Sequence, residues 1–245
     1  MAKKTIASTE ATTAKKREAS KMTSYKMTLK CKNQKQKELV NSIKDNTITI
    51  CKGVFGVGKS YVIGSVALKL LKELTDVDKI ICIVPTVEVG DMHLGLLPGD
   101  LDAKLGFHIL NETDCFTKIL EDSGNDKAED IVKRLIDDKI IEFRPISNLR
   151  GASFRNSVIL VSEAEEFTKE ELFLILTRFE SGKMVISGDP LQSSRYRVKN
   201  GDSGLLYACE KLRNLDGIGI IEFSDTDIVR HDILYSIYKA WNGNQ

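Results

Sequence analysis

The chain has 245 residues, of which 42% are hydrophobic and 29% charged, and a net charge of +1; this composition excludes a disordered polymer and a collagen-like fibre. Its longest purely apolar runs, such as Ile80 to Val84, are far shorter than the roughly 20 residues that cross a bilayer. The N-terminal sequence also lacks the apolar core of a secretory signal. We therefore expect a globular protein of the cytoplasm, with no membrane partner.

The five cysteines and three histidines do not follow the spacing of a disulfide framework or a transition-metal site. No Cys-x-x-Cys pair occurs, and the histidines lie far apart in the chain. We expect reduced thiols and exclude a transition-metal enzyme.

Residues 1–32 form a basic arm, which we treat as a region separate from residues 33–245. The arm contains nine Lys or Arg and two Glu, a charge of +7, so that residues 33–245 carry −6. Its content of Ser, Thr, Ala and Lys is typical of a disordered tail. Two interpretations stay open: the arm is a solvated tail, or it binds the phosphates of single-stranded RNA or DNA.

Residues 33–245 alternate between β-rich apolar runs and helical patterns, which predicts an α/β domain with a mostly parallel sheet flanked by helices. The expected strands are Thr47–Cys51, Lys79–Val84, Ile140–Phe143, Val158–Val161, Met184–Ser187 and Ile218–Phe223. The expected helices are Lys59–Leu74, Lys127–Asp138, Thr168–Phe179, Gly204–Leu212 and His231–Trp241. Residues 85–110 show little periodicity, so we interpret them as a candidate functional loop.

The first predicted strand leads into a complete phosphate-binding loop. The sequence Gly53-Val54-Phe55-Gly56-Val57-Gly58-Lys59-Ser60 matches the pattern G-x-x-x-x-G-K-[ST], and Tyr61 continues into the following helix. Its glycines allow the backbone N–H groups to face a triphosphate at the positive end of that helix. In this pattern Lys59 contacts the β and γ phosphates and Ser60 offers a hydroxyl to Mg²⁺.

The strand at 158–161 ends where a Walker B motif is expected. Such a site needs a carboxylate for the Mg²⁺ shell and a neighbouring carboxylate for the attacking water. Ser162 stands at the first position and Glu163 at the second. The alternative is that the acidic residues from Glu163 onward only form the first turn of a helix.

The strand at 184–187 opens into a turn that carries Asp189 and Gln192. We expect this turn at the same edge of the sheet as the phosphate loop. There Gln192 could sense the γ-phosphate or position water, whereas the simpler alternative is an ordinary Asp-Pro turn.

Together with several shorter signatures in the same order, these motifs resemble the PhoH family of P-loop ATPases, which occurs in bacteria and bacteriophages. The signatures are Gln36, Pro85-Thr86-Val87-Glu88, Leu97-Pro98-Gly99-Asp100, Arg150-Gly151, Thr177-Arg178, Ser203-Gly204-Leu205 and Asp227-Ile228-Val229-Arg230-His231. The resemblance implies a RecA-like fold related to superfamily 1 helicase cores, ATP and Mg²⁺ as cofactors, and a role in RNA or DNA metabolism. It also implies that Gln36 reads adenine.

The chain departs from the family pattern at the Walker B position, where the usual Asp-Glu-Ala-Gln is Ser162-Glu163-Ala164-Glu165. We predict an ATP-binding protein that hydrolyses ATP, in which Ser60 and Ser162 serve the metal ion. Arg178 and Arg230 are candidates for stabilising transition-state charge, within the chain or across a homo-oligomer boundary. The alternative is a silent nucleotide-binding module that has lost the Walker B aspartate; a small-molecule kinase is less supported, because no second basic site for an acceptor is evident.

Overall fold

The computed structural model describes residues 25–85, 101–193 and 198–242. Most of the basic arm, residues 1–24, lies outside the described residues. So do two of the family signatures, Thr86-Val87-Glu88 and Leu97-Pro98-Gly99-Asp100.

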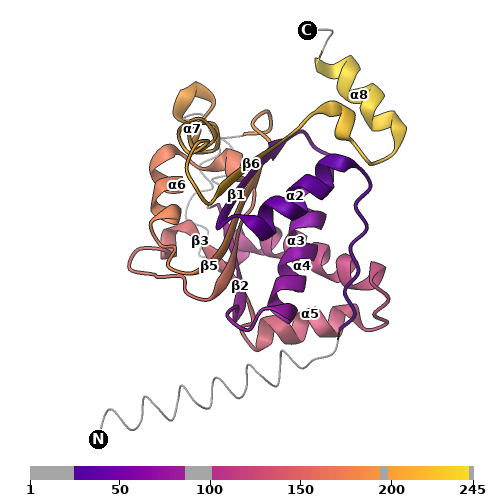
Figure 1. The fold of residues 1–245 in the computed structure, drawn as a ribbon, viewed down its shortest axis with the longest axis vertical. Coiled ribbons are helices and arrows are strands. Elements are labelled where there is room, and N and C mark those ends of the chain that lie inside the picture. Colours follow the sequence, from indigo (N-terminus) through magenta and orange to yellow (C-terminus); the bar gives the residue numbers. More distant parts are fainter. Residues whose placement is uncertain (1–24, 86–100, 194–197, 243–245) are drawn as a thin grey trace, which may run out of the picture.

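Six parallel strands form one sheet, which confirms the predicted α/β fold (Figure 1). The strands are β1 (Ile48–Gly53), β2 (Lys79–Val84), β3 (Ile141–Pro145), β4 (Ser157–Val161), β5 (Gly182–Gly188) and β6 (Ile218–Phe223). Their order across the sheet is β3-β2-β4-β5-β1-β6, so β5 lies between β1 and β4. The strands β2 and β4 are buried on both faces and accordingly read as continuous apolar runs.

Helices cover both faces of the sheet. The described helices are α2 (Gln34–Asp45), α3 (Lys59–Glu73), α4 (Leu101–Asp122), α5 (Ala128–Asp137), α6 (Lys169–Leu176), α7 (Gly204–Lys211) and α8 (Asp232–Asn242). Side chains from α2 to α5 form one buried core against the sheet, and those from α6 and α7 form a second core on the opposite face. Within the described part of the chain, no helix is both long and apolar enough to cross a membrane.

All six strands and five of these helices occur close to their predicted positions, but α2 and α4 are additional. Helix α2 is mostly polar; its N-terminus is capped by Asn33, whose side chain accepts a hydrogen bond from the backbone N–H of Gln36. The prediction of a loop over residues 85–110 is wrong for residues 101–110, because these residues belong to helix α4. Its buried Phe116, Ile119 and Leu120 follow helical spacing only beyond that stretch.

Residues 25–32, the C-terminal end of the basic arm, lie against the domain rather than apart from it. The buried Tyr25 hydroxyl donates to the carbonyl of Leu68 in α3, at 2.8 Å. The backbone N–H of Thr28 donates to the hydroxyl of Ser123, just after α4, at 3.0 Å. Residues 25–32 therefore pass along α3 and the end of α4 before α2 begins.

Candidate nucleotide-binding site

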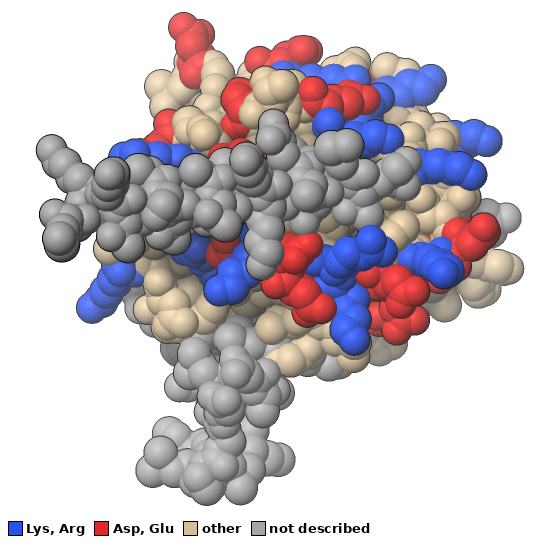
Figure 2. All heavy atoms as spheres, turned by 90° about the horizontal axis from the view of Figure 1, so that it is seen from below, with Lys and Arg blue, Asp and Glu red and all other residues tan. Residues whose placement is uncertain are grey.

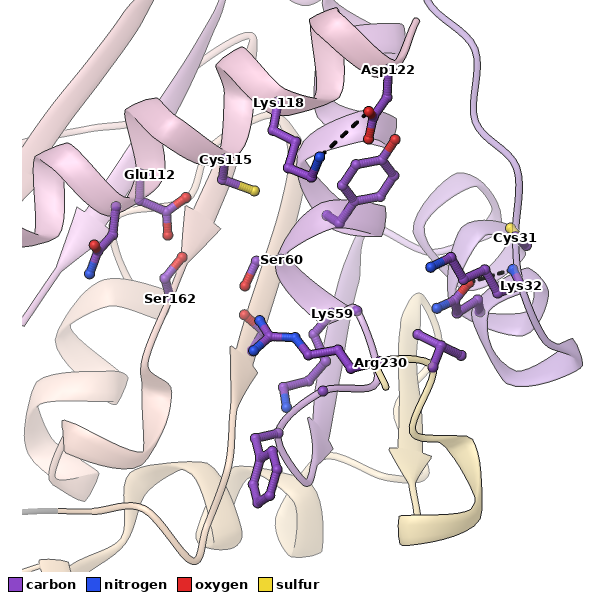
Figure 3. A pocket seen from close by; sticks show the side chains of 18 of the residues that line it. Cys31, Lys32, Lys59, Ser60, Glu112, Cys115, Lys118, Asp122, Ser162 and Arg230 are labelled. Atoms are coloured by element: carbon purple, nitrogen blue, oxygen red, sulfur yellow. Dashed lines mark hydrogen bonds and ion pairs between the residues drawn. The ribbon is translucent and has the colours of Figure 1, made fainter. Parts of the chain in front are cut away.

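A cavity of about 1280 Å³ opens at the carboxyl ends of β1, β4 and β5 (Figure 3). The residues that line it come from the phosphate loop, from the ends of β4 and β5, from α4, from residues 28–32 and from the segment before α8. Ligands of parallel α/β sheets bind at this edge. The cavity is large enough for a nucleotide, since typical ligand pockets measure about 300–1000 Å³.

The phosphate loop connects β1 to α3, as its sequence predicts. Gly56 and Gly58 have φ values of +77° and +82°, which L-amino acids with side chains rarely adopt. A Cβ atom at Gly58 would also lie 2.9 Å from the amide nitrogen of Gln36. The loop therefore needs glycine at this position for both its conformation and its close packing.

Lys59 begins α3, and its side chain folds back over the loop. Its ammonium group donates to the carbonyl oxygens of Gly53 and Val54, at 2.5 and 2.8 Å. Burial lowers the pKa of Lys59, while the nearby carboxylates of Asp189 and Glu165 act in the opposite direction. Ser60 follows and presents its side chain to the cavity.

Gln36 contacts the phosphate loop from α2. Its side chain is buried, donates to the carbonyl of Val57 at 2.8 Å and accepts a hydrogen bond from the backbone N–H of Lys32 at 2.7 Å. One amide thus links the loop to the segment that carries Lys30 and Lys32 into the cavity lining. Both ends of the amide have protein partners in this arrangement, and adenine recognition by Gln36 stays a prediction.

Two further predicted residues are Tyr61, which directly follows the phosphate loop, and Phe55, which belongs to it. Tyr61 lines the cavity; burial first, and then the nearby carboxylate of Asp122 in α4, raises the pKa of Tyr61 to about 12. The ring of Phe55 packs edge-on against Tyr238 of α8, with ring centroids 5.8 Å apart. The C-terminal helix therefore contacts the phosphate loop.

The end of β4 places Ser162 and Glu163 at the cavity. Glu163 has φ +52° and ψ +44°, a left-handed conformation that costs about 1 kcal/mol or more for a residue with a side chain. Strained residues of this kind concentrate at functional sites. Burial raises the pKa of Glu163, an effect that His108 partly offsets and Glu166 increases.

Two side chains of helix α4 lie close to Ser162 and Glu163 at the end of β4. The His108 ring nitrogen Nδ1 lies 3.0 Å from the Glu163 carboxylate. One turn further along α4, the Glu112 carboxylate points toward the Ser162 hydroxyl (Figure 3). Burial raises the pKa of Glu112, and a side-chain hydrogen bond with Ser162 acts in the opposite direction.

The end of β5 contributes Asp189 and Gln192 to the site. Glu165, in the segment after β4, contacts Asp189. The Glu165 carboxylate accepts the backbone N–H of Asp189 at 3.0 Å, and burial raises its pKa to about 7. The Asp189 carboxylate accepts the backbone N–H of Leu191 at 3.1 Å and the side-chain amide of Gln192 at 2.8 Å. Gln192 is exposed at the cavity, where the prediction placed it.

The two candidate arginines lie in different places. The segment before α8 reaches the phosphate loop through a backbone hydrogen bond from Val229 to Gly56, at 3.0 Å. Arg230 follows directly and extends into the cavity toward Lys59 and Ser60 (Figure 3). Arg178 follows α6 and is not among the described residues that line the cavity; its proposed role in stabilising transition-state charge, within the chain or across a subunit boundary, stays a prediction.

Local sequence patterns do not identify the side chains that α4 and residues 28–32 bring to the site, above all His108, Glu112, Lys30 and Lys32. No motif marks them. Their positions in the site depend on how α4 and the N-terminal segment pack on α3, and no local sequence pattern specifies this packing.

The oxygen atoms that face the cavity fit a magnesium ion. Mg²⁺ prefers oxygen ligands and is commonly held by one or two carboxylates together with substrate phosphates. The hydroxyls of Ser60 and Ser162 and several carboxylates line the cavity. In the described parts of the chain, no three His, Cys, Asp or Glu side chains are grouped as a metal cage, so phosphate oxygens would have to complete the site.

A parallel sheet, a glycine loop between β1 and α3, and acidic groups at the end of β4 define a P-loop NTPase fold. The chain belongs to the PhoH family: the model of that family, described as PhoH-like protein, matches residues 28–242. The chain is 34% identical over 215 residues to a PhoH-like protein of Bacillus subtilis and 28% identical over 212 residues to Protein PhoH of Escherichia coli. These matches cover 87% and 86% of this chain but only 64% and 57% of the relatives.

Proposed function

We propose that the protein binds ATP together with Mg²⁺ in this cavity and hydrolyses the bond between the β and γ phosphates, releasing ADP and phosphate. The observation that carries the proposal is the complete phosphate loop in its folded geometry, with Glu163 facing the same cavity from the end of β4. Membership of a P-loop family supports it.

On this proposal the loop and its neighbours bind the phosphates. The backbone N–H groups at the start of α3 and the ammonium of Lys59 face the β and γ phosphates, where a charge-assisted contact is strongest. Lys59 exchanges its contacts with the Gly53 and Val54 carbonyls for phosphate oxygens. Arg230 adds a second positive charge from the segment before α8.

Magnesium, when bound, neutralises charge that develops on the phosphates. Ser60 offers a hydroxyl oxygen to it, and Glu163 accepts a proton from the attacking water. The raised pKa of the Glu163 carboxyl favours that role, because a base works best when its pKa lies nearer the working pH.

Nucleic acid is the macromolecular partner that we propose, bound through the basic arm. On the face shown in Figure 2, the visible Lys and Arg side chains are interspersed with Asp and Glu. The basic arm, residues 1–32, which carries a net charge of +7, is therefore a better candidate for contact with nucleic-acid phosphates than that face. Deleting residues 1–24 should flatten the dependence of RNA or DNA affinity on salt; equal slopes for both proteins would refute this contact.

The function itself is tested by calorimetric titration with ATP and by steady-state ATP hydrolysis, with and without single-stranded RNA. Lys59→Ala should weaken ATP binding about tenfold or more, the scale of one charge-assisted contact. Lys69→Ala is the matched control, because Lys69 lies on the same helix and pairs with Glu73 outside the cavity. Equal affinity in the Lys59 variant and the parent would refute the site, and tight binding without turnover would support the silent module instead.

A further inference from the structure

The magnesium site of this chain lacks a carboxylate where its strand would supply one. Ser162 follows β4 at the position expected to compensate the charge of the metal ion, and a neutral hydroxyl cannot do so. A site that uses the metal ion needs this charge from another element.

Helix α4 brings a carboxylate to that position. Glu112 lines the cavity, is half-buried, and lies opposite Ser162, whose hydroxyl acts to lower the pKa of the Glu112 carboxyl. Figure 3 shows its carboxylate pointing toward Ser162. The serine and the glutamate together thus place a hydroxyl and an anionic oxygen at the end of β4.

The position of Glu112 is fixed by the packing of α4. Phe116, one turn further along, is buried, and Ile119 packs so closely on α3 that a Cβ atom at Gly64 would lie 2.8 Å from it. His108, four residues earlier on the same face, contacts Glu163. Two successive turns of α4 therefore face two successive residues of the β4 end.

The other carboxylates near the phosphate loop have different partners. Glu165 accepts the backbone N–H of Asp189, and Asp189 in turn holds Leu191 and Gln192. Glu163 pairs with His108. The Glu112 carboxylate instead faces the hydroxyl at the Walker B position (Figure 3).

We propose that Glu112 supplies, from α4, the metal-binding carboxylate that Ser162 replaces in the Walker B motif. This inference rests on the proposed function, because it concerns the Mg²⁺ ion of the bound nucleotide. On this proposal, the negative charge at the metal site comes from Glu112, which lies 50 positions before Ser162 in the Walker B motif.

The test is the effect of Mg²⁺ on ADP affinity, measured by calorimetry on the full chain, first with EDTA and then at rising MgCl₂. Glu112→Gln should reduce the gain in affinity that Mg²⁺ gives by about tenfold, the scale of one charge-assisted contact. Affinity in EDTA should stay within about twofold of the parent. Glu121→Gln is the matched control, an exposed glutamate on the same helix outside the cavity, and it should behave as the parent.

A second variant separates a metal-binding role from a structural one. Adding Ser162→Asp to Glu112→Gln should restore the response to Mg²⁺, because it returns a carboxylate to the same place from the strand. A Glu112→Gln protein with an unchanged Mg²⁺ response would overturn the inference. So would a loss of ADP affinity in EDTA that Ser162→Asp does not rescue, accompanied by a lower melting temperature.

The proposed function can fail separately. If Lys59→Ala leaves nucleotide affinity unchanged, the nucleotide site itself is wrong. If Lys59→Ala weakens binding and the parent responds to Mg²⁺ while Glu112→Gln responds equally, only the role of Glu112 is refuted.

Discussion

The two halves of the candidate site are built in different ways. The phosphate half is local: one continuous run from Gly53 to Ser60 supplies its glycines, its lysine and its hydroxyl. The half at the end of β4 is assembled from distant parts, because α4 places Glu112 and His108 against Ser162 and Glu163. In the proposed function, phosphate binding would thus depend mainly on backbone conformation, whereas the geometry of the acidic half depends on how α4 packs against the end of β4.

The residues of the two halves can therefore change independently of one another. A loop made of backbone N–H groups tolerates few substitutions, since each of its glycines holds a conformation that side chains disfavour. A carboxylate, by contrast, can reach the same point from a strand or from a neighbouring helix.

The largest effect should come from Glu163→Gln, which separates the two halves by function. The change removes a base but no phosphate contact, so ATP hydrolysis should fall on the order of 100-fold or more. ATP affinity should stay as in the parent. Single-turnover hydrolysis and calorimetric titration of the same preparation measure both quantities.

Glu170→Gln, a change of another glutamate that lies beyond the cavity lining, is the control for this prediction. A Glu163→Gln protein that loses ATP affinity as strongly as turnover would contradict the separation, because Glu163 would then be part of phosphate binding.

A smaller effect is expected from Gly58→Ala in the phosphate half. The left-handed φ of +82° costs an alanine about 1–2 kcal/mol, and the new methyl group would press on the Gln36 amide. ATP affinity should fall about tenfold, the scale of one lost charge-assisted contact, and the melting temperature should drop by several degrees.

Gly151→Ala provides the comparison, since Gly151 has φ +79° and an added Cβ atom there would meet nothing within 4 Å. It shares the backbone cost but not the contact with Gln36. Calorimetry and thermal melts of both variants should therefore show loss of ATP affinity at Gly58 alone; an equal loss at both positions would contradict a role for this contact.

The smallest effect concerns Glu165 and pH. Because burial raises its pKa to about 7 from the ordinary 4.5, the folded protein binds a proton between these pH values that the unfolded chain has released. Its contribution to stability therefore falls as pH rises from about 4.5 to about 7. Glu165→Gln, which keeps an oxygen for the Asp189 N–H, should raise the melting temperature at pH 8 by about 2–4 °C, roughly 1 kcal/mol.

The same variant should differ less from the parent at about pH 5, where the Glu165 carboxyl of the folded protein is protonated. Thermal melts across this range measure the difference, with Glu170→Gln as the exposed control. A gap between parent and variant that is constant with pH would show that Glu165 does not titrate in the folded protein.

Local patterns were sufficient to predict the strands, the phosphate loop and the position of Glu163. Buried parallel strands such as β2 are continuous apolar runs, and the loop is a fixed spacing of glycines. The family resemblance rested on the same local signatures, and the family match confirms it.

Helix α2, helix α4 and the acidic half were beyond local patterns. Helix α2 is mostly polar and is fixed by its Asn33 cap and by the Gln36 contact with Val57. The pairing of Glu112 with Ser162 joins residues 50 positions apart, and only the tertiary packing of α4 on α3 brings them together.

The place of β5 in the sheet sets a length scale for the chemistry. Neighbouring strands lie about 4.8 Å apart, so one intervening strand separates the ends of β1 and β4 by about 10 Å. On the proposed function, that span would accommodate a phosphoryl group with a metal ion and a water molecule between the two halves. If β4 were paired directly with β1, the Glu163 carboxylate would lie against the γ-phosphate of a bound nucleotide. These two negative groups would repel one another, and no space would be left between them for the attacking water.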